Sequence, residues 1–220
     1  MIKELPKLYV CLSAEGVENA LRQLGGEHCA ELRVDLVKPT LDEVKELLSK
    51  KDVSYIVTCR PGVFDEESSL EYLTTAARLG ADYIDIEIER GSEAAARLKS
   101  ACDGTKCQLI ISYHNFECTP SLDELRSVVA ECCGRGADIV KIACKVNSYA
   151  DNSALLSLYG DGDGIVAFGM GELGKISRLA SLGCGARFTY VASDFGAGTA
   201  PGQLTVSQMR RCMQSLSLMD

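Results

Sequence analysis

The chain has 220 residues, of which 46% are hydrophobic, and a formal net charge of −8. The acidic balance argues against nucleic acid or an anionic membrane surface as a partner. No apolar run is long enough to span a bilayer, and the polar start does not resemble a signal peptide. The length can bury a full core and lies in the range of single α/β barrels, so we expect one domain over residues 1–220, located in the cytoplasm.

The sequence contains eleven cysteines and two histidines. The number of cysteines is odd, and they are scattered through strand and helix patterns, so a disulfide framework is not expected. The Cys132-Cys133 pair and the spacing of Cys102 and Cys107 lack the two-by-two arrangement of a zinc site. We therefore predict reduced, mostly buried thiols and no metal site.

Short apolar segments typical of strands alternate with amphipathic helical patterns along the chain. Strands are predicted at residues 8–12, 30–36, 55–59, 83–88, 108–113, 139–143, 165–168 and 188–191. Helices are predicted near 15–25, 41–50, 67–79, 92–101, 121–134, 150–159, 172–182 and 205–217. This alternation is the pattern of a (β/α)8 TIM barrel. An open doubly wound sheet is the alternative, but no Gly-x-Gly-x-x-Gly turn follows the first strand.

Several predicted helices begin or end with residues that are typical of helix caps. Ser121 precedes Glu124 by three residues, which is the spacing of a capping box, and Thr205 lies at the corresponding start of the last helix. Gly80 and Gly136 each lie between a helical pattern and an Ala-Asp pair that enters a strand. Glycine at these positions predicts a left-handed helix end.

A lysine lies inside one of the most apolar predicted strands. Strand side chains alternate, so Ile139, Lys141 and Ala143 share one face, while Val140 and Ile142 share the other. Burying an ammonium group costs roughly several kcal/mol unless the group is paired or neutralised. Buried lysines are the usual amine nucleophiles that form imines with ketones. A lysine at the strand end that extends to solvent is the alternative.

Charged residues gather at the ends of the predicted strands, where (β/α)8 barrels carry their chemistry. Those on strands 30–36 and 83–88 alternate, so each set is predicted to share one face. Helices cover the outer face of a closed barrel, so inward charges must pair inside it. Such an arrangement is explained better by function than by stability, although each residue alone has a structural explanation. The residues concerned are Glu31, Arg33, Asp35, Arg60, Asp85, Glu87, Glu89, His114 and Lys141.

A series of short motifs follows these strand ends. The motifs are Glu31-Leu-Arg33-Val-Asp35, Thr58-Cys-Arg60, Tyr83-Ile-Asp85-Ile-Glu87, Ser112-Tyr-His114-Asn-Phe116, Asp138-Ile-Val-Lys141-Ile-Ala, Met170-Gly, Ile176-Ser-Arg178 and Ala200-Pro-Gly-Gln203. Each motif is weak alone, but in this order and spacing they resemble the type I 3-dehydroquinate dehydratases. The resemblance runs from residue 31 to residue 203 and implies a barrel without a metal or a cofactor.

The resemblance also implies a role for each site residue. Lys141 would attack the C3 ketone of 3-dehydroquinate to form an imine. His114 would transfer protons, removing one at C2 and assisting loss of the C1 hydroxyl as water. Arg178 matches the arginine that binds the substrate carboxylate. The contacts to the ring hydroxyls are matched by Glu31, Arg33, Arg60 and Gln203, and the closing loop by Thr199. The apolar walls of the pocket are matched by Met170 and Phe188. The carboxylates that would orient His114 and Arg60 are matched by Asp85 and Glu87.

Two positions depart from the family pattern. Many members carry a glutamate and a Gly-Gly pair shortly after the residue that matches Arg60. Here Phe64 lies at the position of that glutamate, and Glu66 or Glu67 are the candidates to support Arg60 in its place. The closing loop has Thr199 where a serine is common, which retains a hydroxyl.

The motifs leave two other functions open. One is an imine-forming aldolase, but such an enzyme needs phosphate-binding glycine turns after its last two strands, and the glycine-rich stretch here ends in Ala-Pro-Gly-Gln. The other is a catalytically impaired, ligand-binding relative, against which Lys141, His114 and Arg178 argue. Lys145 is a second lysine near the same strand end, but the inner face and the family motif both favour Lys141 as the nucleophile.

The expected partner is a small molecule, 3-dehydroquinate, and neither nucleic acid nor a membrane is expected. A homodimer is compatible with the sequence. Some relatives are fused to a shikimate dehydrogenase, and this chain ends at Asp220 without a dinucleotide-binding segment. We therefore expect either a stand-alone enzyme or one part of such a fusion.

Overall fold

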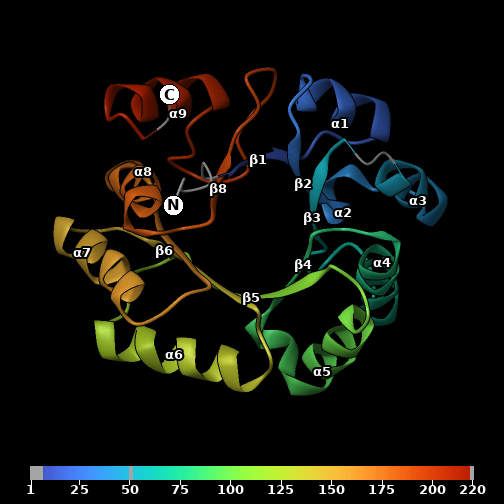
Figure 1. Cartoon of the computed structure of the whole chain (residues 1–220), viewed down its shortest axis with the longest axis horizontal. Coiled ribbons are helices and arrows are strands. Elements are labelled where there is room, and N and C mark those ends of the chain that lie inside the picture. The colour runs from blue at the N-terminus through green and yellow to red at the C-terminus, as the bar shows by residue number, and fades with distance from the viewer. Residues whose placement is uncertain (1–6, 50–51, 219–220) are drawn as a thin grey trace.

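The computed structural model describes residues 7–49 and 52–218. Within these ranges, eight parallel strands form a nearly closed barrel surrounded by helices (Figure 1). The strands are β1 (Lys7–Leu12), β2 (Cys29–Arg33), β3 (Ser54–Thr58), β4 (Tyr83–Glu87), β5 (Gln108–Asn115), β6 (Ile139–Lys145), β7 (Ile165–Met170) and β8 (Phe188–Val191). The (β/α)8 barrel predicted from the sequence is confirmed.

The helices alternate with the strands and form the outer ring in Figure 1. The α-helices are α1 (Val17–Leu24), α2 (Val34–Val37), α3 (Leu41–Ser49), α4 (Glu66–Leu79), α5 (Gly91–Cys102), α6 (Leu122–Gly134), α7 (Tyr149–Ser157), α8 (Lys175–Cys184) and α9 (Val206–Ser215). The described residues also form three short 3-10 helices: η1 (Ile88–Arg90), η2 (Leu158–Gly160) and η3 (Glu172–Gly174).

Hydrogen bonding orders the strands β7-β6-β5-β4-β3-β2-β1-β8, and each neighbouring pair is parallel. All strands therefore end at the same rim of the barrel. The register places Ser112 on β5 beside Lys141 on β6, and Thr58 on β3 beside Asp85 on β4. These pairings bring polar residues from separate strands to one level of the barrel interior.

Two groups of apolar side chains fill the fold, and they show which face of each strand points inward. Val140 and Ile142 belong to the large core between the barrel and the helices. Ile139 and Ala143 belong to a second cluster inside the barrel, together with Tyr9, Ile56, Tyr83, Ile110, Val166, Phe168, Phe188 and Tyr190. Because side chains alternate along β6, Lys141 lies on the inner face.

The second predicted strand is shorter than expected. Residues 30–36 were expected to be extended, but β2 ends at Arg33 and the chain turns into helix α2. The turn allows Asp35 to accept two hydrogen bonds from the Arg33 guanidinium, at 3.0 and 2.6 Å, and one from the backbone N–H of Arg60. Asp35 therefore supports two arginines instead of continuing the alternation of the strand.

Other boundaries differ less. Glu89 lies in η1 and not on the strand face with Asp85, because β4 ends at Glu87. The helix predicted near 41–50 is α3, and residue 50 lies outside the described residues. The capping box between Ser121 and Glu124 is present, as is one between Thr205 and Gln208.

Candidate active site

A cavity of about 320 Å³ opens at the carboxyl ends of the strands. Its wall combines charged residues from most strands of the barrel with residues of the loop after β8. The predicted site residues that line it are Glu31, Arg33, Arg60, Glu87, His114, Lys141, Met170, Arg178, Thr199 and Gln203. The structure therefore brings together residues from nearly the whole length of the sequence, from Glu31 to Gln203.

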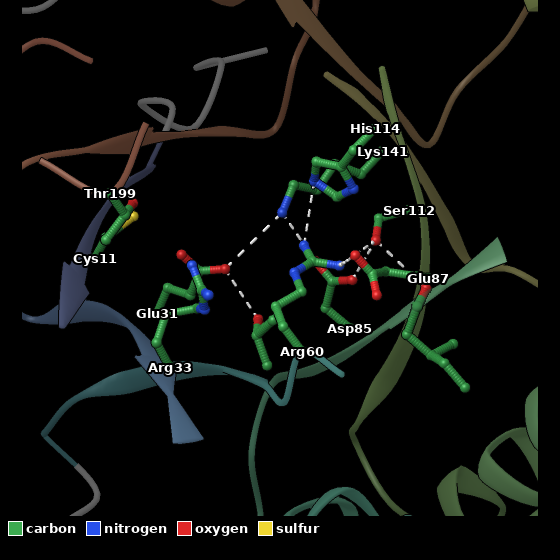
Figure 2. Close-up of polar contacts among 12 residues, drawn as sticks. Cys11, Glu31, Arg33, Arg60, Asp85, Glu87, Ser112, His114, Lys141 and Thr199 are labelled. Atoms are coloured by element: carbon green, nitrogen blue, oxygen red, sulfur yellow. Dashed lines mark hydrogen bonds and ion pairs between the residues drawn. The ribbon is translucent and has the colours of Figure 1, made fainter. Parts of the chain in front are cut away.

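Lys141 is buried in the cavity wall, with 4% of its surface exposed. Its Nζ donates a hydrogen bond to Asp85 Oδ2 at 2.9 Å and lies 3.9 Å from Glu31 Oε1 (Figure 2). A buried ammonium group needs such partners, since its desolvation is otherwise uncompensated. Lys145, the other lysine of β6, is exposed. Of these two lysines of β6, only Lys141 presents its amine to the cavity.

Asp85 lies beneath the cavity floor and holds the surrounding groups in place. Ser112 Oγ donates to Asp85 Oδ1 at 2.6 Å, and Arg60 Nη2 lies 3.5 Å from Oδ2 (Figure 2). Burial opposes ionisation of this carboxyl group, but the positive charges of Lys141 and Arg60 outweigh burial and lower its pKa. Asp85 is therefore an anion at neutral pH.

Arg60 is supported by carboxylates of β4 and not by the segment that follows it. Its Nη1 lies 3.1 Å from Glu87 Oε1 and donates to Ser112 Oγ at 3.1 Å. Burial raises the pKa of Glu87, partly offset by the charge of Arg60. The resemblance implied this orienting role for Asp85 and Glu87, and both carboxylates lie beside Arg60.

The segment after Arg60 has other contacts. The ring of Phe64 packs on Tyr72, with ring centroids 5.1 Å apart. Glu66 lies 3.5 Å from Arg90, and Glu67 pairs with Arg97 at 2.6 Å. The prediction that Glu66 or Glu67 supports Arg60 is therefore wrong, because both side chains are held by arginines outside the cavity.

His114 lies at the end of β5 with its ring against Arg60. Arg60 Nη2 is 3.2 Å from His114 Nε2 (Figure 2), and since a guanidinium only donates, Nε2 accepts. Nδ1 then carries the proton of the neutral ring, and it is buried without a partner. Burial and the positive charges of Arg60 and Lys141 lower the pKa of His114 well below 6.5. The imidazole is therefore uncharged at neutral pH.

Arg178 projects from α8 into the cavity and is almost completely buried, at 1% exposure. Its guanidinium lies over the ring of Phe168, 4.4 Å from the ring centroid. The Nε and Nη2 atoms are buried without a hydrogen-bond partner. Burial lowers the pKa of Arg178 to about 10, so it remains positively charged at neutral pH. A buried guanidinium with free donors is suited to bind a planar anion such as a carboxylate.

The loop after β8 closes one side of the cavity. Gln203 Oε1 accepts from the Thr199 backbone N–H at 2.8 Å, and Gln203 Nε2 donates to Cys11 Sγ at 3.1 Å. Gly171 N–H donates to Pro201 O at 3.0 Å, which ties this loop to the end of β7. These contacts direct the amide of Gln203 toward the cavity.

The structure does not bring Phe188 to the cavity. Phe188 lies deeper in the barrel, where its ring packs on Tyr9 and Tyr83. Tyr190, two residues later on the same face of β8, lines the cavity instead. Side chains near the carboxyl end of a strand lie nearer the mouth, so the position along the strand is the signal that favoured Tyr190.

Other cavity residues were missed because a single sequence gives them no distinctive pattern. Cys11, Phe168 and Ala143 have the pattern of ordinary strand residues. Phe116 belongs to the motif around His114, but no role was assigned to it. The cysteines of the described residues are free thiols. Within residues 7–49 and 52–218, no cluster of three or more His, Cys, Asp or Glu side chains is arranged to hold a metal ion.

The chain resembles proteins of known family over almost its full length. A family model described as type I 3-dehydroquinase matches residues 9–220. A 3-dehydroquinate dehydratase of Desulfotalea psychrophila is 36% identical over 207 residues, covering 89% of this chain and 90% of the relative. The chain belongs to the type I 3-dehydroquinase family.

Solved and bifunctional relatives agree with this family assignment. The crystal structure of the 3-dehydroquinate dehydratase from Aquifex aeolicus matches with a TM-score of 0.83 and 32% identity, covering 97% of this chain and 100% of that one. A chloroplastic bifunctional 3-dehydroquinate dehydratase/shikimate dehydrogenase of Arabidopsis thaliana is 32% identical, and the match covers 32% of its length. No helix within the described ranges is long and apolar enough to cross a membrane.

Proposed function

We propose that the chain dehydrates 3-dehydroquinate to 3-dehydroshikimate through an imine on Lys141. Its membership of the type I 3-dehydroquinase family makes it a 3-dehydroquinate dehydratase. The observation that carries the imine mechanism is the buried amine of Lys141, which is paired with Asp85 and faces a cavity that also contains the unpartnered guanidinium of Arg178.

The first chemical step joins Lys141 to the substrate. The amine loses a proton, and its Nζ lone pair attacks the C3 carbonyl carbon to give a carbinolamine. The carbinolamine oxygen takes up a proton and leaves as water, which forms the C=N bond of a protonated imine. His114, whose lowered pKa keeps it neutral, serves as the group that accepts and returns these protons.

The second step removes the C1 hydroxyl. The positive nitrogen of the imine withdraws electrons, so His114 can take the proton from C2 and leave an enamine. The enamine electrons then form the C1–C2 double bond, and the C1 hydroxyl takes a proton from His114 and departs as water. Hydrolysis consumes one water, releases 3-dehydroshikimate and restores the Lys141 amine. The net reaction is loss of one water.

The other residues are assigned to substrate binding. Arg178 binds the carboxylate, since its Nε and Nη2 lack a partner in the protein. The ring hydroxyls are assigned to Glu31, Arg33, Arg60, Gln203 and Thr199, and Met170 forms an apolar wall. Asp85 and Glu87 act indirectly, because they fix Lys141 and Arg60.

The imine is tested by trapping. The protein is incubated with 3-dehydroquinate and borohydride, and its intact mass and peptides are then measured. A stable adduct on the peptide that contains Lys141 is expected, because borohydride reduces the C=N bond to an unhydrolysable amine. An adduct on Lys145 would show that Lys145, and not Lys141, is the nucleophile. A folded protein with no adduct would contradict the mechanism.

The dependence of activity on pH tests the role of His114. Its pKa is lowered by burial and by the charges of Arg60 and Lys141, so the ring remains a base until the pH falls below the usual value of about 6.5. The acid limb of kcat/KM is therefore expected below pH 6.5 or so, and Arg60→Met should move it upward because one positive charge is removed. An acid limb above that value in the wild-type protein would contradict this role.

The cellular location, the domain organisation and the assembly of the protein are also predicted from the sequence. A cytoplasmic location, a single domain over residues 1–220, a homodimer and a place within a fusion to a shikimate dehydrogenase stay predictions. The Arabidopsis relative supports the last of them, because it carries both activities in its name. The aldolase alternative is not retained, since the family to which the chain belongs is that of the type I 3-dehydroquinases.

A further inference from the structure

The reactive nitrogen of Lys141 touches an aromatic ring that the dehydration chemistry above does not use. Nζ lies over the ring of Tyr190, 4.1 Å from its centroid. Tyr190 is 3% exposed and lines the cavity. A cation at this distance from a ring face is attracted by the electrons of the ring, and the attraction is strongest where water is excluded. The Tyr190 ring is therefore a direct electrostatic partner of the nitrogen.

The hydroxyl of Tyr190 does not explain why the ring is there. It is buried without a hydrogen-bond partner. Burial, together with the nearby carboxylates Asp85 and Glu31, raises the pKa of the phenol well above its usual value, so the ring stays neutral. Packing against Phe168 and Phe188, with ring centroids 5.9 and 5.8 Å away, holds the ring in place. What Tyr190 offers the cavity is the face of its ring.

The face of the ring matters most when the imine forms. An ammonium group has three N–H donors and is held by Asp85, with Glu31 nearby. The carbinolamine nitrogen is neutral, and a positive charge develops on it as water leaves. The resulting protonated imine is planar and keeps one N–H, so it has fewer hydrogen bonds to carboxylates than the ammonium had. A ring face can stabilise that charge, and unlike a carboxylate it cannot remove the proton that maintains it.

We propose that Tyr190 is a further catalytic residue, whose ring face stabilises the positive charge that develops on Lys141 Nζ as the carbinolamine loses water. This inference rests on the proposed imine mechanism. It assigns separate tasks to two neighbours of the nitrogen: Asp85 positions the amine, and Tyr190 stabilises the cationic imine.

A graded series of fluorinated rings tests the proposal. Phenylalanine and its mono-, di- and trifluorinated forms are placed at position 190, and the rate of imine formation is measured by borohydride trapping in a single turnover. Each fluorine withdraws electrons from the ring face, so the logarithm of the rate is expected to fall in nearly equal steps. The Tyr190→Phe variant keeps an unfluorinated ring face. Imine formation should be about tenfold slower than in this variant both with the trifluorinated ring and in Tyr190→Leu.

Phe188 provides a matched control. Its ring packs on Tyr190 but lies below the cavity, so the same fluorinated series at 188 changes packing without changing the ring under Nζ. No graded fall is expected there. Equal rates across the series at 190, with an adduct still trapped on Lys141, would overturn the role of Tyr190 alone. Absence of any adduct on Lys141 in the wild-type protein would instead overturn the imine mechanism.

Discussion

Replacing Lys141 with alanine is expected to lower kcat by at least about 10⁴-fold while the barrel remains folded, since removing the proposed covalent nucleophile removes the whole proposed reaction path. Among the residues that the structure describes, Lys141 is the only lysine that lines the cavity. No other cavity residue can form an imine with a ketone, because arginine side chains stay protonated. The appearance of the conjugated product, followed by its ultraviolet absorbance, measures the effect.

The same substitution has a predictable effect on stability. Lys141→Ala leaves Asp85 buried with Arg60 at 3.5 Å as its nearest remaining cation. Breaking a buried ion pair costs roughly 3 kcal/mol, and the Arg60 charge should reduce that cost. The double variant Lys141→Met with Asp85→Asn removes both charges and should recover much of the stability but none of the activity. Denaturant unfolding separates these outcomes.

Lys145→Ala is the matched control for Lys141→Ala. Both lysines belong to β6, but Lys145 is exposed and its amine does not line the cavity. This variant should keep wild-type kcat and stability. A folded Lys141→Ala protein with near-wild-type turnover would rule out the imine on Lys141. Loss of activity in Lys145→Ala would indicate that Lys145 is the nucleophile.

The fold was predictable because local patterns and topology agree. The regular succession of strands and helices predicts a barrel. Side chains alternate between the two faces of the strand over residues 139–143, which predicts that Lys141 points inward. The pattern fails where a side-chain contact overrides it. Glu31, Arg33 and Asp35 alternate as in a strand, but Asp35 turns back to bind Arg33 and the backbone of Arg60. That contact joins β2 to the segment after β3, so the sequence of β2 alone cannot predict it.

The members of the candidate site were more predictable than their contacts. Motif order placed Lys141, His114 and Arg178 together, but the pairing of Lys141 with Asp85 depends on the register of β4, β5 and β6. The resemblance implied that Asp85 and Glu87 orient Arg60, and Glu87 does contact it. The pairing of Glu66 and Glu67 with other arginines needs three-dimensional information. Phe188 and Tyr190 share one face of β8, and only their depth in the barrel decides which one reaches the cavity.

Arg178→Met is expected to weaken substrate binding while it stabilises the free protein. The substitution removes the donors assigned to the substrate carboxylate, and losing a charged partner of this kind costs about 3 kcal/mol, or roughly a 10²-fold rise in KM. Without substrate, the Arg178 guanidinium is a buried charge whose Nε and Nη2 lack partners. Exchanging it for an apolar side chain of similar length should raise Tm by about 2–4 °C.

Arg33→Met separates this explanation from a general effect of removing an arginine. Arg33 also lines the cavity, but its guanidinium is paired with Asp35 at 3.0 and 2.6 Å. Its loss leaves Asp35, which is 4% exposed, without that partner, so Tm should fall. Opposite shifts of Tm in the two variants, measured without substrate, would identify Arg178 as a preformed anion site that the protein itself leaves unpaired. A fall of Tm in Arg178→Met, or an unchanged KM, would remove its assignment to the carboxylate.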